Sequence, residues 1–138
     1  MFIEAVIENA ERKLLAFVDK IKEHHYSWGA MYFKSSQLPT SLVSEAVVSA
    51  LSPVLADNPA AVYFFRNGDI AICWSGAHKG IEKAVYACFY ERIVFGALKD
   101  IETYYDLQAS TDAESLRDRC EQMIKHQERE AAAKRKAS

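Results

Sequence analysis

Few side chains of this sequence are placed to bind a ligand or take part in a reaction, and the clearest group lies in a polar turn. Residues 61–65 (AVYFF) and 70–74 (IAICW) have strand composition, and Arg66, Asn67, Gly68 and Asp69 separate them. Asn-Gly suits the two positive-φ positions of a tight type I′ turn, so the pattern predicts an antiparallel hairpin. Asp69 is the one acid at its tip. It could bind a ligand, or it could simply close the turn through a backbone hydrogen bond.

A second candidate is the polar segment Lys34-Ser35-Ser36, which follows the apolar run 28–33. Related folds cradle phosphates at this place with loop amides and a helix N-terminus. The segment has no glycine, and an ordinary solvated loop is the alternative interpretation. The candidate residues for a nucleotide or cyclic dinucleotide ligand are therefore Lys34, Ser35, Ser36, Arg66 and Asp69.

The remaining patterns predict no metal site, no cofactor and no catalytic residue. The three cysteines are far apart and form no Cys-x-x-Cys pair, so we expect buried free thiols. His78 and His126 have no matched acid or cysteine at ligand spacing, and the adjacent His24 and His25 of a helix do not face one another as metal ligands would. No nucleophile and base can be paired from their spacing.

Length and composition predict one globular domain of 138 residues. No apolar run reaches the roughly 18 residues that span a membrane, and the N-terminus lacks the basic region of a signal peptide, so we expect a cytoplasmic protein. The formal net charge of −2 gives no reason to expect a nucleic-acid partner. The basic cluster Lys134-Arg135-Lys136 is interpreted as a solvated tail.

Residues 2–24 have the apolar spacing of an amphipathic helix with a heptad seam. This seam suits helix pairing between chains, and it equally suits a cover packed on the protein's own sheet. The candidate interaction residues along it are Ile3, Ile7, Leu14, Phe17 and Ile21.

The other expected elements are a strand at 28–34, a helix from 39–41 to about 55 that Pro53 bends or ends, the hairpin, a helix at 79–98, a strand at 103–107 and a helix from about 112. This order predicts an α+β fold: a ferredoxin-like βαββαβ antiparallel sheet with additional N- and C-terminal helices. We divide the chain into an N-terminal helix (1–25), the core (26–108) and a C-terminal helix with a basic tail (109–138).

The predicted strands carry apolar side chains on both faces, so the sheet needs a second cover. The terminal helices, a partner chain or a ligand could each supply it. A face left bare would be a large exposed apolar patch.

The strand ending in Tyr32-Phe33-Lys34, the following helix and the hairpin Arg66 to Ile70 resemble the GGDEF domain, over about residues 26–108. That family is a bacterial relative of the nucleotidyl cyclases and makes cyclic di-GMP. Its hairpin carries two acids and its first strand a metal-binding aspartate. Here Ile70 stands where the second acid belongs, and residues 29–33 contain no acid. The resemblance therefore implies a degenerate member without enzymatic activity, because one carboxylate cannot hold a pair of metal ions.

The first hypothesis is accordingly a non-catalytic regulatory or protein-interaction domain of bacterial signalling, which self-associates or binds a protein partner. A nucleotide- or cyclic-dinucleotide-binding sensor is the first alternative. An RNA-binding ferredoxin-like module is the second, with bases stacked on Tyr32, Tyr63, Phe65 and Trp74. The strands are poor in Lys and Arg, so buried aromatic packing is the preferred interpretation of these rings.

Overall fold

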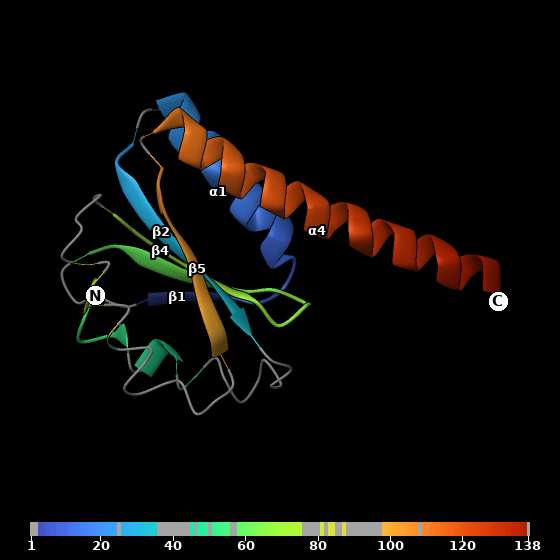
Figure 1. Cartoon of the computed structure of the whole chain (residues 1–138), viewed down its shortest axis with the longest axis horizontal. Coiled ribbons are helices and arrows are strands. Elements are labelled where there is room, and N and C mark those ends of the chain that lie inside the picture. The colour runs from blue at the N-terminus through green and yellow to red at the C-terminus, as the bar shows by residue number, and fades with distance from the viewer. Residues whose placement is uncertain are drawn as a thin grey trace.

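A computed structural model describes residues 3–24, 26–35, 45, 47–49, 51–55, 58–75, 81, 83, 84, 87, 98–107 and 109–137. Five strands form one sheet: β1 (Ile3–Val6), β2 (Trp28–Ser35), β3 (Ala60–Phe64), β4 (Ile70–Ser75) and β5 (Leu98–Asp106). Their order is β1-β3-β4-β2-β5. The sheet is flanked by two long helices, α1 (Ala10–His24) and α4 (Ser110–Ala137) (Figure 1). The predicted α+β class is confirmed.

The N-terminus differs from the helix predicted over residues 2–24. Residues 3–6 form β1, which pairs in parallel with β3 from Ile3↔Ala60 to Val6↔Tyr63. The helix begins only at Ala10, after Asn9 with a φ of 53°. Asparagine tolerates this left-handed conformation, which turns the chain from strand into helix. The prediction was wrong for residues 3–6 because pairing with a distant strand overrides the local apolar spacing.

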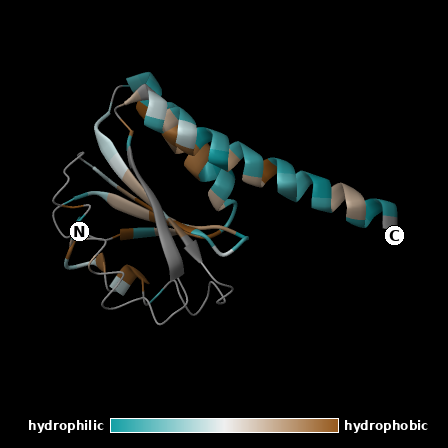
Figure 2. Ribbon diagram, viewed as in Figure 1, coloured by the Kyte–Doolittle hydropathy of each residue, from teal (hydrophilic) through white to brown (hydrophobic). Residues whose placement is uncertain are grey.

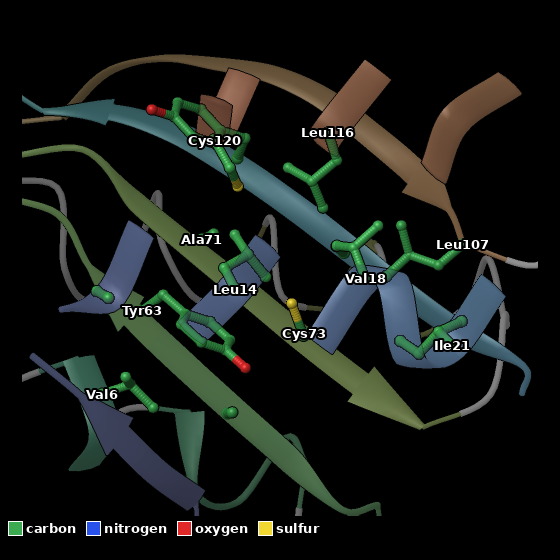
Figure 3. Close-up of a cluster of buried hydrophobic side chains, with 14 of the residues drawn as sticks. Val6, Leu14, Val18, Ile21, Tyr63, Ala71, Cys73, Leu107, Leu116 and Cys120 are labelled. Atoms are coloured by element: carbon green, nitrogen blue, oxygen red, sulfur yellow. The ribbon is translucent and has the colours of Figure 1, made fainter. Parts of the chain in front are cut away.

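Two helices of the same chain cover one face of the sheet. Figure 3 shows Leu14, Val18 and Ile21 of α1 beside Leu116 and Cys120 of α4, over the sheet residues Ala71 and Cys73. Leu14 and Leu116 are completely buried in this layer. Of the three covers left open by the sequence, the terminal helices are the one observed, in the form of α1 and α4.

The opposite face of the sheet carries the alternate side chains of the same strands. Ile70, Ile72 and Trp74 of β4 pack there with Val47 and Leu51. Glu45, residues 47–49 and Leu51 are helical, and the chain turns at residues 52–54, so the predicted helix ends just before Pro53. Its predicted start at 39–41 lies outside the described residues.

The second crossover is described in part. Ile81, Lys83, Ala84 and Ala87 are helical, in agreement with the helix predicted from residue 79. The following strand is longer than predicted: β5 begins at Leu98 rather than Thr103 and pairs with β2 through two irregularities in register. The prediction that residue 98 is helical was therefore wrong.

The β3–β4 hairpin is confirmed, with Phe64↔Ile70 and Ala60↔Trp74 in register. Its turn is not the predicted type I′ turn. The Gly68 N–H donates to the Phe65 carbonyl at 3.0 Å, and the Phe65 N–H donates to the Asp69 carbonyl at 3.0 Å. Gly68 has a φ of 94°, and the described non-glycine residues include no positive φ except that of Asn9. These features define a three-residue loop with a glycine bulge.

Helix α4 runs antiparallel to α1 and extends beyond the body of the molecule (Figure 1). Three exposed ion pairs join the two helices: Arg12–Glu128 at 3.1 Å, Arg117–Asp19 at 2.7 Å and Lys22–Glu114 at 2.9 Å. The projecting part of α4 is mostly hydrophilic (Figure 2). In the described part of the chain, no helix has the length and apolar character needed to span a membrane.

Candidate functional site

A groove of about 580 Å³ lies between the hairpin tip and α4, and we call it the tip groove. The hairpin supplies one wall, and residues of α4 that recur every three or four positions supply the other. Tyr32 of β2 lies between the two walls. The described residues that line the tip groove are Tyr32, Arg66, Asn67, Asp69, Arg119, Gln122, Met123, His126, Gln127 and Glu130.

Asp69 acts as a hydrogen-bond acceptor at the hairpin end of the groove. The Tyr32 hydroxyl donates to Asp69 Oδ2 at 2.6 Å, and Asn67 Nδ2 donates to the same oxygen at 3.2 Å. The Asp69 N–H in turn donates to Asn67 Oδ1 at 2.9 Å. Asp69 thus helps to close the turn through a backbone hydrogen bond, which is one of the two interpretations made from the sequence. Its carboxylate also contacts the Tyr32 hydroxyl, which the sequence did not predict.

Tyr32 is a neutral phenol that donates to this carboxylate. The residue is 1% exposed. The pKa of Tyr32 lies above its ordinary value of 10.0, because burial, the largest cause, and the hydrogen bond to Asp69 both disfavour a phenolate. The hydroxyl also lies 3.6 Å from Met123 Sδ of α4. One side chain thus joins the sheet, the hairpin and α4.

Arg119 of α4 lies on the ring of Tyr32. Its guanidinium carbon is 4.3 Å from the ring centroid, within the range of a cation–π interaction. The Tyr32 ring is also stacked with Phe65, at 5.7 Å between centroids and 18° between planes. These contacts hold a positive charge at a defined place in the tip groove.

Glu11 is a buried acid beneath the hairpin. It is 2% exposed, and its Oε1 accepts a hydrogen bond from the Arg66 N–H at 2.9 Å. The first turn of α1 therefore anchors the first residue of the polar turn. This contact could not be predicted from the sequence, because the partner is a backbone amide 55 residues away.

The structure brings two of the five predicted ligand residues together. Arg66 and Asp69 line the tip groove. Lys34 and Ser35 end β2, opposite Asp100 and Leu98 of β5. Phe33, the residue before Lys34, pairs with Ile70, so the backbone of Lys34 and Ser35 lies at the same end of the sheet as the hairpin tip. The side chains of Lys34 and Ser35, and the whole of Ser36, lie outside the described part.

The predicted interaction seam serves as an intramolecular cover. Leu14 and Ile21 are 0% and 1% exposed, and Phe17 packs edge-on against Trp28 at 4.8 Å between centroids. Ile3 belongs to β1 and is 8% exposed, whereas Ile7 is 48% exposed. Helix pairing between chains through this seam would require α1 to leave the sheet.

The rings considered for base stacking are also inside the protein. Trp74 and Phe65 are 0% and 1% exposed, and Tyr63 is 5% exposed. Burial is the arrangement that the sequence favoured for them. Bases could not stack on these rings unless the helices moved away from the sheet.

Two of the three cysteines are buried free thiols, as predicted, and Cys88 lies outside the described residues. Burial, with the carboxylate of Glu11 as a smaller cause, raises the pKa of Cys120 to about 12. Burial also raises the pKa of Cys73. Both thiols are therefore neutral at physiological pH. Among the residues that the structure describes, no three or more His, Cys, Asp or Glu side chains are grouped to hold a metal ion.

Sequence reasoning missed the α4 wall of the groove. Arg119, Gln122, His126 and Glu130 recur at spacings of three and four residues, but a polar helix face is also the pattern of an ordinary solvated surface. Comparison with known proteins adds no further signal, because no family model, no curated protein and no solved structure matches the chain.

Proposed function

We propose that this chain is a non-catalytic regulatory domain that works by protein interaction, with a ferredoxin-like core that resembles a degenerate GGDEF domain. The observation that carries the proposal is the state of Asp69. This acid, the only one at the hairpin tip, already accepts hydrogen bonds from Tyr32 and Asn67. Its role in the fold favours a structural use over metal chemistry.

The arrangement of the core strands supports the ferredoxin-like part of the proposal. All neighbouring pairs among β2, β3, β4 and β5 are antiparallel, and β4 lies between β2 and β3. Val47, Leu51 and Ile81, from the segments that join these strands, pack on the same face. β1 then adds a fifth strand at one edge.

The projecting part of α4 is the surface that we assign to a partner, either another protein or a second copy of this chain. Side chains from Arg129 to Lys136 are exposed or half-exposed, and most are polar. A helix of this kind, polar on all sides, commonly bridges to another domain or chain. We assign the interaction to this part of α4 and not to the α1 seam, because apolar residues of the seam are buried inside the protein.

Self-association is tested by light scattering on the eluted protein over a range of micromolar concentrations. We expect a mass that rises toward twice 15.6 kDa. Replacing Lys134 and Lys136 by glutamate should weaken the association, whereas Lys20→Glu on α1 serves as a matched control. A monomer at every concentration would remove self-association and leave a different protein as the partner.

The absence of catalysis is tested separately. Incubation with GTP and magnesium should give no cyclic dinucleotide. A product that forms with the natural chain and disappears with Asp69→Ala would contradict the proposal. The cytoplasmic location expected from the sequence stays a prediction.

A second candidate function is a sensor for a nucleotide or cyclic dinucleotide. The presence of Arg66 and Asp69 in one groove favours it. A ligand at a hundred times its dissociation constant should stabilise the protein by about 2.7 kcal/mol, which thermal-shift screening detects. An unchanged melting temperature with every guanine and adenine nucleotide, with and without magnesium, would count against this function.

A further inference from the structure

We propose that the tip groove is a phosphate site in which Arg66 of the hairpin and Arg119 of α4 hold one phosphate group together. The proposal rests on the second candidate function and deepens it, because it assigns half of the site to α4. The ligand class is a small phosphate ester or a pyrophosphate.

The Arg119 guanidinium is positioned before any ligand arrives. Asp69 holds the Tyr32 hydroxyl at 2.6 Å, and the ring of Tyr32 carries the guanidinium at 4.3 Å. Because the ring is buried and stacked on Phe65, it provides a fixed support. A cation held in place loses less conformational entropy when it binds.

Arg66 is fixed from the other side of the groove. Glu11 accepts a hydrogen bond from its backbone N–H at 2.9 Å, which sets where the exposed side chain starts. Within the described residues, the Arg66 guanidinium makes no ion pair. It can therefore turn toward a ligand without breaking a contact that the structure records.

The acids of the groove are already engaged. Asp69 accepts from Tyr32 and Asn67, and Glu130 Oε1 lies 3.1 Å from His126 Nε2. These contacts turn carboxylate oxygens toward other groups of the protein. The guanidinium groups of Arg66 and Arg119 supply the positive charges that a phosphate would contact.

The chemistry of these groups selects a phosphate. A guanidinium offers paired N–H donors whose spacing matches two phosphate oxygens. The side-chain amides of Asn67, Gln122 and Gln127 provide neutral hydrogen bonds for the rest of the ligand. A volume of about 580 Å³ lies within the usual range for small-molecule sites.

The test is titration calorimetry on the full chain with GMP, GTP, cyclic di-GMP, pyrophosphate and guanosine. The phosphate-bearing probes should bind and guanosine should not. Arg66→Gln and Arg119→Gln should each weaken binding about tenfold or more, because each removes a charge-assisted pair of hydrogen bonds. Arg129→Gln, an exposed change on α4 outside the groove, should leave the affinity unchanged.

Arg119→Lys provides a milder variant. It keeps the positive charge but loses the paired donors, so its affinity should lie between those of the natural chain and Arg119→Gln. Circular dichroism and melting temperature verify that each variant is folded.

The outcomes separate this inference from the sensor function. Ligands that bind both glutamine variants with natural affinity would overturn the phosphate site and leave the sensor function standing. Pyrophosphate binding without nucleotide binding would support the phosphate site and contradict the nucleotide sensor. If no probe binds at millimolar concentration, both are overturned.

Discussion

Tyr32 connects three elements through a single side chain, and its hydroxyl can be removed without removing the ring. In Tyr32→Phe the stacking on Phe65 and the support for Arg119 remain, but the hydrogen bond to Asp69 is lost. We expect the free energy of unfolding to fall by about 1–2 kcal/mol, because the acceptor is charged and partly exposed. Urea denaturation measures this.

Tyr26 offers the matched control for that experiment. It is 48% exposed and stacks on His24 through its ring, which Tyr26→Phe preserves. This variant should have nearly the stability of the natural chain. An equal loss in the two variants would mean that the Tyr32–Asp69 hydrogen bond contributes nothing specific.

The buried phenols also predict how stability depends on pH. Burial is the main cause that raises the pKa of Tyr32 and of Tyr63 above the ordinary value of 10.0. Above about pH 10 the unfolded chain releases these protons and the folded chain keeps them, so the unfolded state is favoured. The contribution of these two phenols is complete below about pH 10 and should fall as the pH rises beyond it, whereas the buried thiols of Cys73 and Cys120 add a loss that begins near their ordinary pKa of 9.0.

This dependence is tested by urea midpoints measured between about pH 8 and 11, a range that includes the ordinary pKa of tyrosine. Tyr63→Phe removes one of the two groups and should make the alkaline loss smaller. The same slope in the natural chain and in Tyr63→Phe would contradict the assignment to the buried phenols.

At the scale of elements, α1 is a cover whose apolar seam is already used. Leu14→Ala removes a side chain that is 0% exposed and should lower the free energy of unfolding by about 2–5 kcal/mol. Ile7→Ala, at a residue that is 48% exposed, should change it by less than about 0.5 kcal/mol. Thermal or urea unfolding gives both values. Similar losses would contradict the assignment of the seam to the interior.

β2 is a central strand with no room for a side chain at Gly29. A Cβ placed there would lie 2.9 Å from Cε2 of Trp74, a side chain that is 0% exposed and opposite Gly29 in the β2–β4 register. Gly29→Ala should therefore cost about 1–3 kcal/mol of stability, as overpacked substitutions do. Chemical denaturation measures this cost.

A second substitution identifies the cause of that loss. The smaller ring in Trp74→Phe gives space for the new methyl group, so Gly29→Ala should cost less in the Trp74→Phe background. An unchanged cost in both backgrounds would mean that backbone effects, rather than contact with Trp74, determine it.

The elements that the sequence predicted correctly are those whose signals are local. The hairpin follows from two apolar runs around Asn67-Gly68, and the helix end at Pro53 follows from proline chemistry. β1 could not be predicted in this way, because Ile3 and Ile7 fit a helical repeat and the evidence for a strand lies in its pairing with β3. The turn type was missed since Asn-Gly also suits a three-residue loop.

At the scale of the whole molecule, the candidate site was half predictable. Arg66 and Asp69 stand next to a recognisable turn, so the sequence identified them. Arg119 and the rest of the α4 wall reach the hairpin only because α4 packs along α1, which no local pattern encodes. The sequence left open what covers the second face of the sheet, and the structure shows that α1 and α4 cover it together.

The layer made by α1 and α4 also constrains the order of events in folding. The Arg12–Glu128 ion pair joins residues separated by 116 positions, and β1 must wait for β3 before it can pair. Contacts between such distant segments are slow to form. During synthesis, the apolar face above Ala71 and Cys73 lacks the part of its cover that α4 supplies until α4 leaves the ribosome. The chain is therefore most exposed to aggregation in the interval before α4 is complete.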